Sequence, residues 1–112
     1  MALSENTNGS QTCTIGTEHT LATVTSANVF QLSLDLNAMV GGTTPDILEI
    51  REYMKARSSD SERLLKVTTV VGAQVEIGYQ TVPRISPHHY KVTIKQTQGT
   101  GRAVPWSIYQ AQ

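Results

Sequence analysis

The sequence predicts an all-β protein, an antiparallel β-sandwich of jelly-roll type with an extended N-terminal arm. Apolar residues recur at every second position in several short runs, which is the side-chain period of a strand with one buried face. Threonine and other β-branched residues are frequent in these runs, and turn-forming residues separate them at intervals of about ten residues. Regularly spaced short strands of this kind are typical of sandwiches and jelly rolls.

Length and charge limit the domain organisation and the kind of partner. The chain has 112 residues and a formal net charge of zero. This length is enough for one domain with its own core, which we expect over residues 12–112. The charges are scattered and provide no field to concentrate nucleic acid or an anionic membrane, so we expect neither as a partner. No apolar run is long enough for a signal peptide or a membrane span, and we expect a soluble protein made without export.

Residues 1–11 are predicted to form the arm. They contain almost nothing to bury, so the segment alone should be disordered, and we expect a neighbouring surface to hold it. Residues 12–24 are rich in threonine with scattered apolar positions, which is consistent with one or two short strands.

The clearest strand covers residues 28–36. Apolar side chains at positions 30, 32, 34 and 36 alternate with polar ones, which predicts a core strand with one dry and one wet face. Residues 37–46 follow as a loop, because Gly-Gly and Pro-Asp pairs interrupt regular structure.

Residues 47–57 fit two structures. As a helix, the segment would be capped by residues 44–46 and would carry an apolar stripe. As a strand, it would turn Leu48, Ile50 and Met54 to one face, with Glu52 as the exception. We favour a long strand because the neighbouring segments all read as strands. The polar run 58–62 is then the turn that ends it.

Three further segments precede the end of the chain. Residues 64–71 are dense in β-branched side chains and are predicted to be a strand whose second face is also partly covered. Val75, Ile77 and Tyr79 alternate in another short strand. Residues 81–87 contain Pro83 and Pro87, which cannot donate ladder hydrogen bonds, so we expect an extended crossing and not a paired strand.

The last two strands are predicted to form a single β-hairpin over residues 90–109. Apolar side chains alternate in residues 90–95, and Val104, Trp106 and Ile108 repeat the alternation after a turn with two glycines. This alternation places Trp106 in the core. Pro105 lies within the second strand, which predicts either an edge strand or a position whose amide would point outward. An edge strand here could be covered by another subunit.

Few residues suggest chemistry. Cys13 is the only cysteine, which excludes an internal disulfide and a cysteine-based zinc site, and we expect it to be a small buried side chain. His19 lies beside Glu18, but the sequence assigns it no nucleophile. The adjacent residues His88 and His89 point to opposite faces of a strand and cannot easily hold one metal ion. We therefore expect no enzyme, no cofactor and no metal ion.

Two other patterns have simpler interpretations. The acidic residues Asp46, Glu49 and Glu52 fit a solvated charged face better than a pair of catalytic carboxylates. The Gly-x-Gly at residues 99–101 leads from one strand into another and not into a helix, so it is predicted to be a turn and not a phosphate-binding loop.

Three motifs resemble a small group of tailed-bacteriophage virion proteins encoded near head genes. The motifs are FQLSLDL at 30–36, LEIR at 48–51, and KQTQGTGR at 95–102 with Pro105-Trp106, and the similarity covers residues 17–109. With this length, the chain is most similar to the capsid decoration proteins, also called staple or cement proteins, of short-tailed phages of the epsilon-fifteen type. The resemblance implies a β-sandwich, made in the host cytoplasm, that lies on the outer capsid surface of the virion and clamps neighbouring major capsid protein subunits.

The resemblance also implies partners and contact residues. The partners would be the major capsid protein and a second copy of the chain, in a homodimer across a two-fold axis. Repeated, modest contacts of this kind would stabilise the shell against internal DNA pressure. We expect the contacts to come from the arm and the last strand, at Leu3, Asn6, Asn8, Pro105, Trp106 and Tyr109.

Other functions remain open from the sequence. Within the virion, the chain could be a neck or tail component. A carbohydrate-binding β-sandwich module would need exposed aromatic side chains, for which Tyr53, Tyr79 and Tyr109 are the candidates. A hydrolase or isomerase would need a pocket that holds His19 or His88 with a carboxylate.

Overall fold

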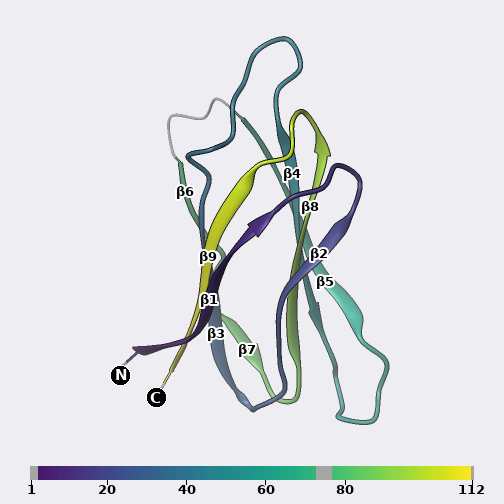
Figure 1. Cartoon of the computed structure of the whole chain (residues 1–112). Coiled ribbons are helices and arrows are strands. Elements are labelled where there is room, and N and C mark those ends of the chain that lie inside the picture. The colour runs from purple at the N-terminus through teal and green to yellow at the C-terminus, as the bar shows by residue number, and fades with distance from the viewer. Residues whose placement is uncertain (1–2, 73–76, 112) are drawn as a thin grey trace.

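The computed structural model describes residues 3–72 and 77–111. All regular structure in these two ranges is β-strand, and the strands form two antiparallel sheets that pack face to face (Figure 1). The predicted all-β sandwich is therefore confirmed. Among the described residues no helix is long and apolar enough to cross a membrane.

The chain crosses from one sheet to the other repeatedly. Sheet A has the order β1-β9-β3-β6, with β7 also paired to β3, and sheet B has the order β2-β8-β4-β5. The strands of sheet A are β1 (Leu3–Thr12), β3 (Asn28–Asp35), β6 (Gly78–Gln80), β7 (Arg84–Ser86) and β9 (Ala103–Ala111). The strands of sheet B are β2 (Glu18–Val24), β4 (Ile47–Met54), β5 (Arg63–Val71) and β8 (Tyr90–Gln98). The first strand is therefore the neighbour of the last in sheet A, and β2 is the neighbour of β8 in sheet B.

The core lies between the sheets and comes from alternate positions of the central strands. Phe30 and Leu32 on β3, Ile94 on β8 and Ile108 on β9 are fully buried. Phe30 stacks on Tyr90 of the opposite sheet, with ring centroids 5.7 Å apart. The alternation at residues 28–36 thus predicted the buried face of β3 correctly.

The predicted hairpin over residues 90–109 is wrong. β8 pairs with β2 and β4 in sheet B, whereas β9 pairs with β1 and β3 in sheet A. The glycine turn therefore carries the chain from one sheet to the other. A hairpin within one sheet and a crossing between two sheets both consist of alternating strands around a glycine-rich turn. The local sequence pattern could therefore not distinguish the two connections.

The predicted edge position of Pro105 is also wrong, because β9 lies between β1 and β3. The register with β3 ends at Trp106, opposite Leu34, while Pro105 itself lies opposite Ser10 of β1. The proline therefore sits one residue beyond the last pair with β3. A missing N–H is tolerated at the end of a ladder as well as at the edge of a sheet.

The predicted unpaired crossing at residues 81–87 contains a short paired strand, β7, which lies against residues 28–30 of β3. Pro83 and Pro87 flank β7 on either side, so they limit its length without interrupting its ladder. Before it, Thr81 is held to β3 by hydrogen bonds in both directions with Leu32. Of the strand predicted from alternation at 75–79, Val75 lies outside the described residues, and the observed strand β6 contains Tyr79.

The remaining segments show where propensity was informative. The strand favoured for residues 47–57 is confirmed as β4, and its exception, Glu52, points inward and is buried. The strand expected at 64–71 is confirmed as β5, but it is an edge strand on which Val70 is the buried side chain, so its second face is less covered than expected. The described residues of the expected arm belong to β1. This strand pairs along its length with β9 of the same chain.

Candidate interaction surfaces

The six residues expected to make contacts lie on two neighbouring strands. Leu3, Asn6 and Asn8 are on β1, and the other three are on β9, its antiparallel partner. Asn6 lies at an irregularity in the register and donates a hydrogen bond to Oε1 of Gln110 at 2.9 Å. The structure therefore brings the sequence-predicted contact residues together on sheet A.

The outer face of sheet A is hollowed beside these residues. One open depression has a volume of about 410 Å³ and is lined in part by Asn8, Pro105 and Trp106. A second depression, of about 380 Å³, is lined in part by Leu3 and Tyr109. The two depressions share Ser33 and Ser107, so they form one continuous surface, here called the outer trough. Its side chains include Glu5, Asn8, Ser33, Asp35, Ser107 and Tyr109.

Trp106 contributes to the core more than to this surface. Its side chain is partly buried and packs against the apolar core, as its alternation with Val104 and Ile108 predicted. Gly9 on β1 leaves room for the indole, because a Cβ at Gly9 would lie 3.1 Å from Cζ2 of Trp106.

A second surface is apolar and was not predicted. Seven of the eleven exposed large apolar side chains in the described part of the chain come from β5 and from the β6–β7 segment. β1 and β2 are adjacent at one side of the sandwich, so the two strand orders place β5 and β6–β7 at the other side. We call these residues together the apolar side: Leu64, Leu65, Val67, Val71, Ile77, Val82 and Ile85. They do not share one face, because Val67 pairs with Arg51 on the outer face of sheet B and Ile85 pairs with Val29 on the outer face of sheet A.

Contiguous exposed apolar residues mark interaction sites in soluble proteins, and the single strand β5 carries four of them, Leu64, Leu65, Val67 and Val71. Ile85 is 85% exposed, which is the largest value among the described apolar side chains. β5 pairs with β4 on one side, and no described strand pairs with its other side, so its outer backbone groups are open to a partner. The apolar side therefore offers both side chains and backbone for binding.

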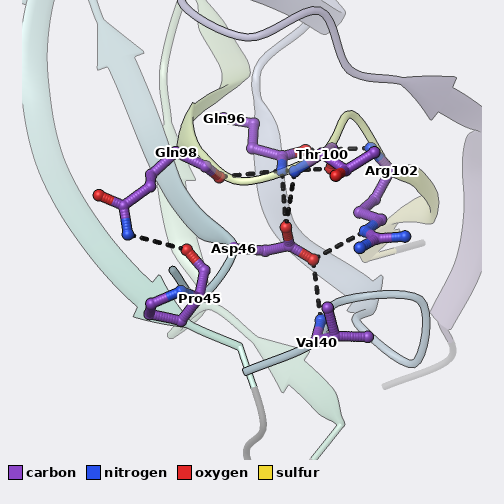
Figure 2. Close-up of polar contacts among 7 residues, drawn as sticks. All are labelled: Val40, Pro45, Asp46, Gln96, Gln98, Thr100 and Arg102. Carbon is purple, nitrogen blue, oxygen red and sulfur yellow. Dashed lines mark hydrogen bonds and ion pairs between the residues drawn. The ribbon is translucent and has the colours of Figure 1, made fainter. Parts of the chain in front are cut away.

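The best-formed polar cluster surrounds Asp46, which is 1% exposed (Figure 2). Its Oδ2 accepts hydrogen bonds from the Val40 amide and from Nε of Arg102, both at 2.8 Å. Its Oδ1 accepts from the Thr100 amide at 3.0 Å and from Nε2 of Gln96 at 3.3 Å. Four donors saturate this carboxylate, so it fastens the loop before β4 to the turn between β8 and β9 and has no free lone pair for a substrate.

The pKa of Asp46 reflects the same contacts. Burial alone raises the pKa of this carboxyl group, but the hydrogen bonds from Val40, Arg102 and Thr100 outweigh burial and hold it below its ordinary value. Asp46 is therefore ionised at neutral pH. The cluster is a structural clasp and not the solvated face that the sequence predicted.

A second buried carboxylate joins the two sheets. Glu52 of β4 is 1% exposed and accepts two hydrogen bonds from Arg84 of β7, from Nε and Nη2, both at 2.9 Å. The Tyr90 hydroxyl on β8 donates to Oε2 of Glu52 at 2.8 Å. Burial, and then the nearby Glu52 charge, raise the pKa of Tyr90, so this hydroxyl stays a donor. This cluster also has a structural explanation.

The tyrosines expected to stack on a sugar differ in their accessibility. The ring of Tyr53 is covered by the Lys91 ammonium group, 4.5 Å from its centroid, and its hydroxyl donates to Glu18 at 2.6 Å. Tyr79 packs against the core. Tyr109 is 39% exposed at the outer trough, so it alone of the three presents an open ring.

The histidines lie in separate places. Nε2 of His19 accepts a hydrogen bond from the Thr14 amide at 3.0 Å, and His89 is buried against Glu62. No group of three or more histidine, cysteine or acidic side chains in residues 3–72 and 77–111 is arranged to hold a metal ion. Cys13 is buried, and burial raises the pKa of its thiol, which keeps it protonated at neutral pH.

No family model matches this chain, and no curated protein or solved structure matches it either. The interaction surfaces above are therefore argued from geometry alone.

Proposed function

We propose that the protein is a structural, non-enzymatic virion component that binds the outer surface of a phage capsid and clamps neighbouring major capsid protein subunits. The apolar side carries this proposal. It consists of two patches on the edges of two different sheets, with Val67 at the centre of β5 and Ile85 on β7. Val67 points outward from sheet B and Ile85 points outward from sheet A, so the two patches face away from each other and can contact different subunits.

The strand order gives independent support. β1 beside β9 in one sheet and β2 beside β8 in the other is the order expected of a jelly roll, an architecture found in viral capsid and lectin domains. Because unrelated functions share this architecture, the strand order supports the proposal and the exposed surface carries it.

The buried clasps suit a protein under mechanical load. Asp46 ties a loop to the turn between the sheets, and Glu52 ties β4 to β7 across the core. Each apolar contact with the capsid can be modest because a capsid repeats the site many times. The second partner that we propose is another copy of the chain, in a homodimer across a two-fold axis.

The test is an occupancy assay on capsids that lack the protein. The variants are Val67→Asp and Ile85→Asp, which place a charge in each patch, and the matched control is Thr23→Asp on β2, an exposed strand position at the opposite side. We expect each patch variant to lower capsid occupancy and the temperature of DNA release, and the control to bind like the wild type. Full occupancy by the double patch variant would defeat the proposal.

Imaging of the particle separates the head from other locations. Density on the outside of the shell, over seams between subunits, is the expected result. Copies confined to the neck or tail would replace the capsid proposal by the neck or tail alternative. Sedimentation of the free protein tests the homodimer separately, because a monomer in solution leaves capsid binding intact.

A further inference from the structure

The outer trough has the hydrogen-bonding groups of a saccharide site. Its polar lining includes the carboxylates of Glu5 and Asp35, the hydroxyl groups of Ser33 and Ser107, and the side-chain amides of Asn8, Gln31 and Gln80. Within residues 3–72 and 77–111, no lysine, arginine or histidine lines either depression. Carboxylates, amides and hydroxyls are the groups that donate to and accept from the hydroxyls of a sugar.

Several of these groups are held in place before any ligand arrives. Nδ2 of Asn8 donates to Oε2 of Glu5 at 2.7 Å, and Nε2 of Gln80 donates to Oγ of Ser33 at 3.1 Å. The carbonyl oxygens of Asn8 and Gln80 and the second oxygen of Glu5 keep acceptor capacity. The side chains stand on the paired strands β1, β3, β6 and β9, and a site on rigid elements loses little entropy on binding.

Tyr109 supplies the apolar contact that a sugar also needs. It lies at the trough with its ring partly exposed, and Leu3 lines the same depression. An aromatic ring offers a flat apolar surface and a hydroxyl at its edge, which matches a ligand with both C–H and O–H groups on one face. Because Lys91 covers Tyr53 and Tyr79 packs partly buried against the core, Tyr109 is the most open of the three rings for stacking.

We propose that the outer trough binds a neutral saccharide. The charge of the trough selects the class of sugar: Glu5 and Asp35 repel phosphate, sulfate and carboxylate groups, and no basic side chain among the described residues lines the trough to compensate them. The site goes beyond the capsid contact, since it lies on the outer face of sheet A and shares no residue with the apolar side. Its shallowness favours weak single-site binding that gains strength when many copies are displayed together.

The experiment presents the full-length chain, labelled and displayed multivalently, to an array of neutral and acidic oligosaccharides. We expect saturable binding to neutral members, and a loss of about tenfold or more in affinity for Tyr109→Ala and for Asn8→Ala, because each leaves ligand groups unpaired. Glu49→Gln, on the outer face of sheet B, is the matched control and should bind like the wild type. Far-UV circular dichroism of each variant shows that the sandwich is retained.

A charge-reversal variant makes the test sharper. Replacing both acids, Glu5→Lys with Asp35→Lys, should abolish the exclusion of anions and shift binding towards acidic oligosaccharides. The proposal is overturned if no neutral oligosaccharide binds saturably, or if the trough variants bind like the wild type. Preference of the wild type for polylysine over every neutral sugar would overturn it as well, because binding would then report the negative charge alone. All these outcomes are independent of capsid occupancy.

Discussion

Glu52 and Asp46 are buried charges whose partners were not visible in the sequence. Sequence spacing placed both in a charged outer face, whereas the structure turns them inward against Arg84 and Arg102. These partners lie 32 and 56 residues away along the chain. Local patterns report which face a residue occupies only when its neighbours alternate regularly, and a charge at an inward position reads as an exception until its partner is known.

The Glu52 cluster makes a prediction about stability. Arg84→Met leaves the Glu52 carboxylate buried beside Tyr90 without its cation, and breaking a buried pair in this way costs about 3–5 kcal/mol. The double variant Glu52→Leu with Arg84→Met removes both charges and should recover much of this loss. Urea unfolding of the three proteins measures the difference. A single variant as stable as the wild type would mean that the pair contributes nothing to the fold.

Gly99 makes a second prediction at the residue scale. Its φ is +97°, and an added Cβ would lie 2.0 Å from Oδ1 of Asp46, so Gly99→Ala meets both backbone strain and a collision. We expect it to destabilise the fold by about 2 kcal/mol or more. Gly78→Ala is the control, because nothing lies within 4 Å of its added Cβ. Thermal unfolding compares the stability of the two variants. Equal losses of stability would show that the collision with Asp46 does not determine the cost of Gly99→Ala.

At the scale of elements, alternation predicted strands well and their partners poorly. The buried faces of β3, β4 and β8 follow from the two-residue period, because that period directly reports which side chains point inward. The period says nothing about which strand lies alongside, so β8 and β9 were joined as a hairpin although they belong to different sheets. Register and sheet membership depend on contacts between distant segments such as β1 with β9 and β4 with β8.

The strand β1 makes a prediction at this scale. Deleting residues 1–11 removes nearly all of β1 and exposes the edge of β9, while sheet B keeps its pairs. We expect amide hydrogen exchange to accelerate on β9 and to change little on β8. Protection of β9 that is unchanged by the deletion would show that β1 does not stabilise the sheet in solution, and would restore the view of this segment as an arm.

At the scale of the molecule, the contact residues predicted from the sequence lie together on sheet A, whereas the sequence did not predict the apolar side. The expected contacts at Leu3, Asn8 and Tyr109 meet because β1 and β9 are neighbours, which the sequence did not show. The apolar side was missed because the β-branched run of β5 was interpreted as a partly covered strand. Leu64, Leu65 and Val67 are apolar on both faces of that strand, a pattern that fits an exposed edge as well as a buried strand.

The acid response of the whole fold follows from three carboxylates. Burial raises the pKa of Glu18, Asp46 and Glu62, but hydrogen bonds outweigh it and lower each pKa below the ordinary values of 4.5, 3.8 and 4.5. A lowered folded pKa means that the unfolded chain takes up protons first as the pH falls. The stability that these groups contribute is therefore complete above about pH 5 and is lost progressively as the pH falls through their folded pKa values.

Urea unfolding between pH 7 and pH 3 tests this prediction. We expect a constant midpoint near neutrality and a fall below about pH 4.5, which is steeper for the wild type than for Asp46→Asn. The variant starts from lower stability at pH 7, because an amide cannot accept all the hydrogen bonds of a carboxylate, and it has one fewer group to protonate. If the unfolding midpoints of the two proteins fall in parallel as the pH is lowered, Asp46 has the same pKa in the folded and unfolded chains. Its hydrogen bonds would then contribute no stability that is lost in acid.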